Sequence, residues 1–437
     1  RIGTVTPWRD DRVAVALADG IYSVMLSDGR LECLVKIEED LPANRFNDGK
    51  CDPAGRLWAG TMNDDETGER SGRLYRIDPG LLPEGLPDVL GSAAGNPAAW
   101  PARRAQILEM LSREVYGYAP PPPEGLIAEV ISREDTAYAG KAVHTTYSLS
   151  FDTPGGRFAF PFHLMVPPVD RPPLFIHIAF RPDLPDRYCP VEEILDRGFA
   201  LASFCYQDVA PDADDGFAGG LAGCYDMANR KPDGWGKIAL WAWAASRVLD
   251  ALQGMSGFDP GRVGVIGHSR LGKAALWCAA QDERFSMVYT NESGCSGTAL
   301  TRGKRGEHIH QIMDAFGYWF CDNYRRHAGQ EDEMPFDQHW LLALIAPRLL
   351  CHGGAELDIW SDPYAEFLGC LAADPVYRLL GQPGLAGPSE GVSDQVPDGP
   401  VRFAYHDGRI GYHLRTGTHF LSRTDWNQAM AFWRKQG

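Results

Sequence analysis

A serine stands between a hydrophobic run and a helix-like stretch in the segment 261–277, which reads GRVGVIGHSRLGKAALW. The apolar run Val263 to Ile266 is followed by a glycine, a histidine and then Ser269. A tight turn between a strand and a helix lifts a serine hydroxyl clear of the backbone, where it can act as a nucleophile. The hydroxyl is weakly nucleophilic alone and needs a base that an acid orients. The segment predicts nucleophilic chemistry at Ser269; the alternative is that this serine only caps the helix.

The base and the acid are expected downstream of Ser269. In folds that carry a serine on such a strand-to-helix turn, the catalytic groups follow in the order serine, acid and histidine. His419 lies in the loop before the last predicted helix and is favoured as the base over His413, which is predicted at a strand end. Two acids follow predicted strands: Glu292 in TNESGCSG and Asp358 in AELDIWSDP. Either carboxylate can accept a hydrogen bond from the imidazole, so the residues leave both open.

The elements that must position these residues alternate between strands and helices from about residue 101 onward. The runs at 173–180 and 198–206 are continuously apolar, which is typical of strands buried on both faces. A long helix is predicted over 235–254 and ends at a glycine. The alternation predicts an α/β fold with a parallel sheet and right-handed crossovers. We therefore expect an α/β-hydrolase three-layer sandwich over residues 101–437.

The first part of the chain has a different pattern of residues. Residues 1–80 read as short strands separated by Asp-Gly turns, which is typical of antiparallel meanders such as propeller blades. This length suffices for about two blades, whereas a closed propeller needs at least four. Residues 81–100 are rich in glycine, proline and alanine and are predicted to be a linker. We therefore expect a partial propeller-like segment, a linker and a catalytic domain.

Composition narrows the classes of partner. The 437 residues carry a formal net charge of -16, which disfavours nucleic acid as a ligand. No apolar run of about 18 residues occurs, so we expect no membrane span. The ten cysteines show no CxxC spacing, and no disulfide can be assigned from them. The chain begins at Arg1 without a secretory signal, so we expect its natural beginning to be missing.

Residues from about 95 to 437 resemble carbohydrate esterase family 15, the glucuronoyl esterases, and especially its bacterial members. The stretches that carry the resemblance include GHSRLGKAAL, NESGCSGTAL, FGYWFCDNY, FDQHWLLALIAPR and LDIWSDPYAEFL. The family's elbow is Gly-Cys-Ser-Arg-x-Gly-Lys, and this chain has His268 in place of the cysteine. The disulfide that fungal members form from that cysteine is therefore expected to be missing.

The resemblance implies a role for each residue of the predicted catalytic group. It makes Ser269 the nucleophile and His419 the base, and it places Arg270 at the oxyanion of the tetrahedral intermediate. Glu292 matches the acid of the fungal pattern, and Asp358 matches the alternative acid of bacterial members. Because the match around Glu292 is the closer one, we expect its loss to be the more damaging.

The resemblance also implies a sugar subsite. Lys273 would hold a sugar hydroxyl, and Trp360 would form a flat wall beside a uronate ring. A substrate-binding glutamate of the fungal pattern falls here on Phe316, and Glu307 is a substitute for it. The implied activity is serine-dependent hydrolysis of esters of (4-O-methyl-)glucuronic acid, as in lignin–glucuronoxylan cross-links, without cofactor or metal. The substrate would be a small-molecule or polysaccharide uronate ester, and the implied location is secreted or periplasmic.

The stretch NRFNDGKCDPAGRLWAGTM resembles the gluconolactonase, regucalcin and senescence-marker-protein family. The family's sugar-acid contacts correspond to Arg45 and Asn47, which could equally be turn residues of a remnant. The family's metal ligands lie on blades beyond this segment, so we expect no metal there. The segment leaves open a lactone-hydrolysing or binding role, which metal binding would test.

Two further alternatives concern the larger part of the chain. A less specific carbohydrate acetyl esterase, such as a xylan deacetylase, would use the same triad without needing Lys273 or Trp360. A non-catalytic carbohydrate-binding protein is disfavoured because the serine, acid and histidine all occur in the expected order.

Overall fold

The computed structural model describes residues 2–9, 12–38, 41, 43–51, 57–64, 71–77, 82–83, 85–387 and 400–437. The chain divides into two compact units, Arg1–Pro83 and Glu84–Gly437. The division falls within the segment that the sequence marks as a linker. None of the helices in the described ranges is both long and apolar enough to cross a membrane.

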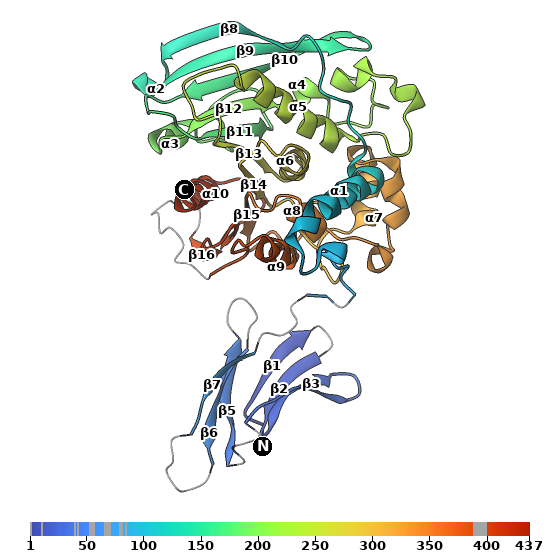
Figure 1. Ribbon diagram of the computed structural model, residues 1–437, viewed down its shortest axis with the longest axis vertical. Helices are drawn as coiled ribbons and strands as arrows, with labels where there is room; N and C mark the ends of the chain where they lie inside the picture. Colours follow the sequence, from blue (N-terminus) through green and yellow to red (C-terminus); the bar gives the residue numbers. More distant parts are fainter. Residues whose placement is uncertain are drawn as a thin grey trace. The chain divides into compact units, whose positions relative to one another are not determined.

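The first unit consists of two antiparallel sheets (Figure 1). One contains β1 (Thr4–Arg9), β2 (Arg12–Leu17), β3 (Gly20–Met25) and β4 (Leu31–Lys36). The other contains β5 (Asn44–Cys51), β6 (Leu57–Asn63) and β7 (Leu74–Ile77). Alternating side chains form a small core between them, namely Ala14, Ala16, Ile21, Phe46, Leu57 and Ala59. The expectation of an all-β segment is confirmed.

The second unit is built on a ten-stranded sheet, counted over the described residues. Its strand order is β16-β17-β15-β14-β13-β11-β12-β10-β9-β8. The six central strands, β17, β15, β14, β13, β11 and β12, are parallel to one another. Strands β8, β9, β10 and β16 pair antiparallel at the edges. The bounds are β8 (Ile127–Thr136), β9 (Ala142–Thr153), β10 (Gly156–Val166), β11 (Leu174–Ala179), β12 (Ala200–Cys205), β13 (Val263–His268), β14 (Met287–Asn291), β15 (Leu349–Ala355), β16 (Val401–Tyr405) and β17 (Ile410–Arg415).

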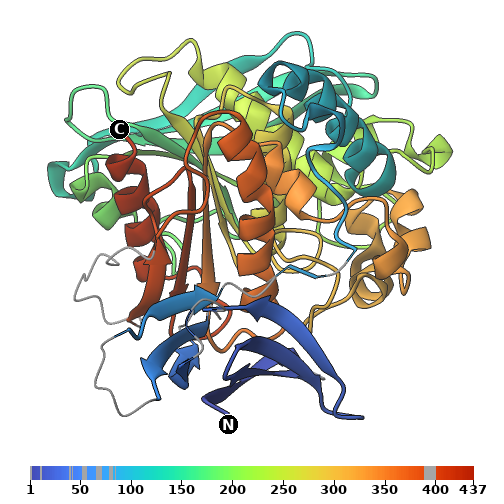
Figure 2. The ribbon, with the colours of Figure 1, turned by 60° about the horizontal axis from the view of Figure 1, so that its bottom comes forward.

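Helices cover both faces of this sheet (Figures 1 and 2), which completes the predicted three-layer α/β-hydrolase sandwich. Helices α3 and α10 lie on one face, and α5, α6, α8 and α9 lie on the other. The α-helices are α1 (Trp100–Leu111), α2 (Ala137–Gly140), α3 (Val191–Asp196), α4 (Tyr206–Val209), α5 (Lys237–Leu252), α6 (Arg270–Gln281), α7 (Ile309–Phe316), α8 (His339–Ala343), α9 (Pro363–Leu379) and α10 (Arg423–Lys435). Shorter helical turns are η1 (Gly91–Ala93), η2 (Pro97–Ala99), η3 (Ser112–Tyr116), η4 (Gly220–Cys224), η5 (Met227–Asn229), η6 (Gly317–Trp319), η7 (Asp322–His327) and η8 (Glu331–Glu333).

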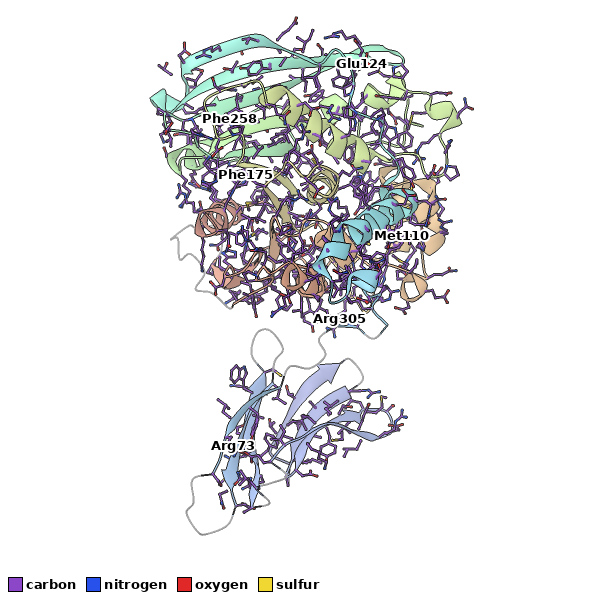
Figure 3. All side chains as sticks on the ribbon, in the orientation of Figure 1. Arg73, Met110, Glu124, Phe175, Phe258 and Arg305 are labelled. Carbon is purple, nitrogen blue, oxygen red and sulfur yellow. The ribbon has the colours of Figure 1, made fainter. Side chains whose placement is uncertain are left out.

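Large aromatic side chains fill the layer between the sheet and α10. Phe175 of β11, labelled in Figure 3, meets the rings of Trp426 and Trp433 edge to face, with centroids 5.7 and 4.8 Å away. All three side chains are buried. Burying aromatic groups of this size is a main source of core stability. The packing fixes α10 and therefore the loop that leads into it from β17.

The segment before α1 belongs to the second unit. The Arg103 side chain donates to the backbone oxygens of Val89 and Asp88 at 3.0 and 2.9 Å. The backbone oxygen of Pro87 accepts from the His339 ring at 2.9 Å. The part of the predicted linker from Pro87 onward is therefore tied to the second unit by side-chain hydrogen bonds.

Candidate active site

Ser269 occupies a strained turn between β13 and α6. Its φ and ψ are 57° and -126°, a region that non-glycine residues rarely adopt and that is typical of functional sites. Gly267 allows the turn to close, because a Cβ at this position would lie 2.1 Å from the backbone oxygen of Leu271. Gly272 lets α6 approach β14, where a Cβ would come within 2.9 Å of a strand side chain. The predicted tight turn between the strand and the helix is therefore present at Ser269.

The other predicted catalytic residues also follow parallel strands. Glu292 comes directly after β14, Asp358 follows β15, and His419 follows β17. These strands lie side by side with β13, in the order β17-β15-β14-β13. Since the carboxyl ends of parallel strands meet at one edge of a sheet, this order gathers the residues around the elbow.

Both acids contact the same nitrogen of His419. Nδ1 lies 2.6 Å from Oδ2 of Asp358 and 3.1 Å from Oε2 of Glu292. The carboxylates are buried, whereas the imidazole is 44% exposed. The shorter contact is to Asp358, although the sequence favoured Glu292. Glu292 also forms hydrogen bonds with Arg415 and Phe420, which lie far from it in the sequence.

Glu292 is held by a buried ionic network. It accepts a hydrogen bond from Nη2 of Arg415 at 2.7 Å and another from the backbone N–H of Phe420 at 2.8 Å. Nε of Arg415 donates to Asp425 at 2.7 Å, and the ring of His413 lies 3.0 Å from the same carboxylate. His413, the alternative base, is thus a buried part of this network. Sequence reasoning missed Arg415 and Asp425, which occur only as ordinary charged residues in the final strand and helix.

The three ionisable groups influence one another. Burial acts to raise the pKa of Asp358, but hydrogen bonds from His419 and Ser361 outweigh it and lower the pKa. Burial raises the pKa of Glu292 above its ordinary value, while His419 and Arg415 act in the opposite direction. Burial would lower the pKa of His419, but the two carboxylates outweigh it and raise the pKa to about 9. The site therefore stabilises the imidazolium form of His419.

His268 packs directly against the predicted base. Its ring centroid lies 4.5 Å from that of His419, and its Nδ1 lies 2.6 Å from Oδ1 of Asn291. The amide oxygen can only accept, so Nδ1 carries the proton. Burial lowers the pKa of His268 to about 3, which keeps the ring neutral.

All ten cysteines of the chain are free.

The predicted sugar-binding residues lie on two loops and one helix. Lys273 lies one turn into α6, is buried, and donates from Nζ to the backbone oxygen of Ser293 at 2.6 Å. Burial lowers its pKa, and Glu307 counteracts this effect. The backbone N–H of Glu307 donates to the backbone oxygen of Trp360 at 2.9 Å, which joins the two loops. Trp360 is 54% exposed.

Two groups of possible metal ligands occur among the described residues. One is His268, Glu292 and His419, and the other is Cys351, His406 and His413. Within each group the candidate ligand atoms lie within 4.8 Å of one another. The first group coincides with the predicted base and one of its acids.

The first unit places its two predicted sugar-acid residues on β5. Arg45 forms an ion pair with Asp64 at 2.7 Å and also donates to the backbone oxygen of Phe46. Asn47 is exposed. The guanidinium is thus engaged within the unit itself.

Comparison with known proteins connects both units to families. The family described as "Glucuronyl esterase, fungi" matches residues 173–381, and the "SMP-30/Gluconolactonase/LRE-like region" matches residues 1–93. Both resemblances inferred from the sequence are therefore confirmed.

Similar proteins agree with these matches. Carbohydrate esterase MZ0003 from an unknown prokaryotic organism is 37% identical over 55% of this chain and 54% of its own length. The 4-O-methyl-glucuronoyl methylesterase of Schizophyllum commune is 29% identical over 68% of this chain and 74% of its own. The alignment with the first of these relatives thus spans about half of that protein.

Solved structures extend the similarity across the second unit. A glucuronoyl esterase from Solibacter usitatus superposes with a TM-score of 0.71 at 32% identity, covering 82% of this chain and 100% of that one. A promiscuous CE15 esterase from a marine bacterial metagenome gives the same TM-score at 29% identity, covering 82% and 97%. With this identity and coverage, the chain belongs to the glucuronoyl esterases of carbohydrate esterase family 15.

Proposed function

We propose that the second unit hydrolyses esters of glucuronic acid with Ser269 as the nucleophile. The observation that carries the proposal is the pair of carboxylates on Nδ1 of His419, at the strand edge that bears the elbow. Because Nδ1 donates its proton to a carboxylate, Nε2 of the neutral ring carries the lone pair that a general base needs.

In the proposed reaction, His419 takes the hydroxyl proton of Ser269 as the oxygen attacks the ester carbonyl. The tetrahedral intermediate is stabilised by the N–H groups of Arg270, and one such donor contributes roughly 3–4 kcal/mol to lowering the barrier. The imidazolium then protonates the departing alcohol, which leaves a uronyl ester on the serine. Water, deprotonated by His419, releases the uronate and restores the hydroxyl.

The acid part of the substrate is inferred from the residues beside the elbow. Lys273 and Glu307 supply a cation and an acceptor for sugar hydroxyls, and Trp360 supplies an apolar surface for a sugar ring. The printed names of the relatives, which include glucuronoyl methylesterases, support the same acid. We therefore propose glucuronate or 4-O-methyl-glucuronate esters as substrates, including those that join lignin to glucuronoxylan.

The test compares benzyl D-glucuronate with 4-nitrophenyl acetate on the purified protein. We expect kcat/KM to depend on the uronate: Lys273→Met should lower it strongly for the glucuronate ester and little for the acetate. Rapid hydrolysis of acetylated xylan with no turnover of the glucuronate ester would instead support a carbohydrate acetyl esterase.

We further propose that residues 101–437, with the segment that packs before them, form the complete catalytic domain. A shortened chain that starts at Gly85 keeps the contacts of Val89 and Pro87 with the second unit and should retain full activity. A start at Gly95 removes both contacts and should lower the melting temperature. A chain from Gly85 that is folded but inactive would show that the first unit takes part in the reaction.

A further inference from the structure

Asp212 gathers several donors beside the elbow. It lies in the long connection between α4 and α5, and its side chain is only 7% exposed. Its carboxylate forms an ion pair with Nη1 of Arg270. It also accepts from Nε1 of Trp319 at 2.8 Å and from the hydroxyls of Tyr206 and Tyr318 at 3.1 and 3.2 Å. One carboxylate therefore joins the residue after the nucleophile to two other parts of the chain.

The donors to Asp212 are fixed in their protonated forms. Burial and the neighbouring carboxylate raise the pKa of Tyr206 and Tyr318 to about 12 each. Both phenols are therefore donors throughout the pH range in which an esterase works. Because all four contacts donate toward the carboxylate, its position does not depend on a single weak hydrogen bond.

The guanidinium of Arg270 is held on its faces as well as at one edge. Its central carbon lies 4.8 Å from the ring centroid of Trp319, 5.7 Å from Phe316 and 5.8 Å from Phe180. Its Nε is buried without a hydrogen-bond partner. The ion pair thus leaves this donor uncommitted while the side chain is prevented from swinging away.

The loop that carries Asp212 is anchored on both sides of it. Lys237, the fully buried first residue of α5, donates from Nζ to the backbone oxygens of Pro211 and Ala213, each at 2.6 Å. The same ammonium group forms an ion pair with Asp215 at 2.7 Å. Moving the loop would leave the buried ammonium group of Lys237 without its partners, which is costly. These contacts therefore hold the loop in place.

We infer that Asp212 is a positioning residue that holds the guanidinium of Arg270 where the oxyanion forms. The inference rests on the proposed function, because it needs a tetrahedral intermediate at Ser269. A donor that is already oriented stabilises the transition state without reorganising during the reaction. Asp212 acts only through Arg270 and does not touch the substrate.

A double-mutant cycle tests this role. Asp212→Asn should lower kcat on benzyl D-glucuronate about tenfold, with KM changed less than about twofold, because the ground state does not need the oriented donor. In the Arg270→Ala background the same substitution should change kcat by less than about twofold, because its target is gone. Asp214→Asn removes the same charge from an exposed position on the loop and is the matched control.

Each other outcome is informative. An equal loss of kcat in both backgrounds, or a rise in kcat in Asp212→Asn, would overturn the inference; the rise would mean that Asp212 restrains Arg270. If Asp212→Asn does not fold, Tyr318→Phe removes one donor and should give a smaller loss that is likewise absent without Arg270. If the wild-type protein hydrolyses only the acetate, the proposed substrate fails, and the cycle is run on that ester, which forms the same oxyanion.

Discussion

The two carboxylates that meet at His419 belong to very different regions of the molecule. Glu292 follows a buried central strand and is fixed by Arg415 and by the backbone of the histidine loop. Asp358 lies on the loop between β15 and α9, where Ser361 is its other partner at 2.5 Å. Its neighbours on that loop are largely exposed, namely Leu357, Ile359 and Trp360.

The two acids therefore differ in role: Glu292 belongs to the buried network behind the site, whereas Asp358 lies on an exposed loop. Glu292 is paired whether or not His419 is protonated, so much of its charge serves Arg415 and the network behind the site. Asp358 has the shorter contact to Nδ1 and a lowered pKa, so it is the acid that responds directly to the imidazole. We infer that both carboxylates fix the tautomer of His419 and that Asp358 contributes more to catalysis.

The largest expected effect comes from removing both acids. Asp358→Ala combined with Glu292→Ala should lower kcat by about 10⁴, the loss typical of a triad without its acid. Each single variant should lose only part of this, with the greater loss in Asp358→Ala. The kcat of all three on one uronate ester is the measurement, with circular dichroism to verify folding. A single variant as inactive as the double would break the idea of shared acids.

The scaffold role of the Glu292 region is tested by stability. Arg415→Met leaves Glu292 and Asp425 buried without their shared cation and should lower the free energy of unfolding by about 3–5 kcal/mol. Arg402→Met is the matched control, because Arg402 pairs with Glu356 at 3.0 Å on the exposed edge of the same sheet. Its cost should not exceed about 1 kcal/mol. Equal costs in urea unfolding would contradict the comparison.

The same contrast shows what the sequence could predict. The pattern around Ser269 and the loop of His419 were identifiable because their chemistry is encoded in a few adjacent residues. The sequence could not show that both acids reach the same nitrogen of His419, because the distance between the ends of two strands depends on the order of strands in the whole sheet. Arg415, Asp425 and Asp212 were missed for the same reason, since each acquires its role from partners that the chain brings in from a distance.

The loop region should affect substrate binding more than stability. Trp360→Ala should lower kcat/KM for benzyl D-glucuronate about tenfold, because a sugar ring loses its apolar wall, and should change acetate hydrolysis less than about twofold. Ile359→Ala, on the same loop and more exposed, is the control. A similar loss on both esters would show that Trp360 supports the loop rather than the uronate.

The smallest effect is a shift in pH dependence. The base must be neutral, and the two carboxylates raise the pKa of His419, so kcat/KM should rise with pH toward about 9. Removing the Asp358 carboxylate lowers that pKa, so the acidic limb of kcat/KM in Asp358→Ala should move to lower pH by about one unit. An acidic limb that stays in place would show that Glu292 alone determines the pKa.

The most direct test of the central claim is kcat of Ser269→Ala beside the wild type on benzyl D-glucuronate. We expect a loss of about 10⁵–10⁶ in kcat in a variant that unfolds at the same temperature, because the uronyl group then has no serine oxygen at the elbow to attach to. A folded variant that keeps more than about one hundredth of the wild-type kcat would contradict a serine mechanism at this elbow.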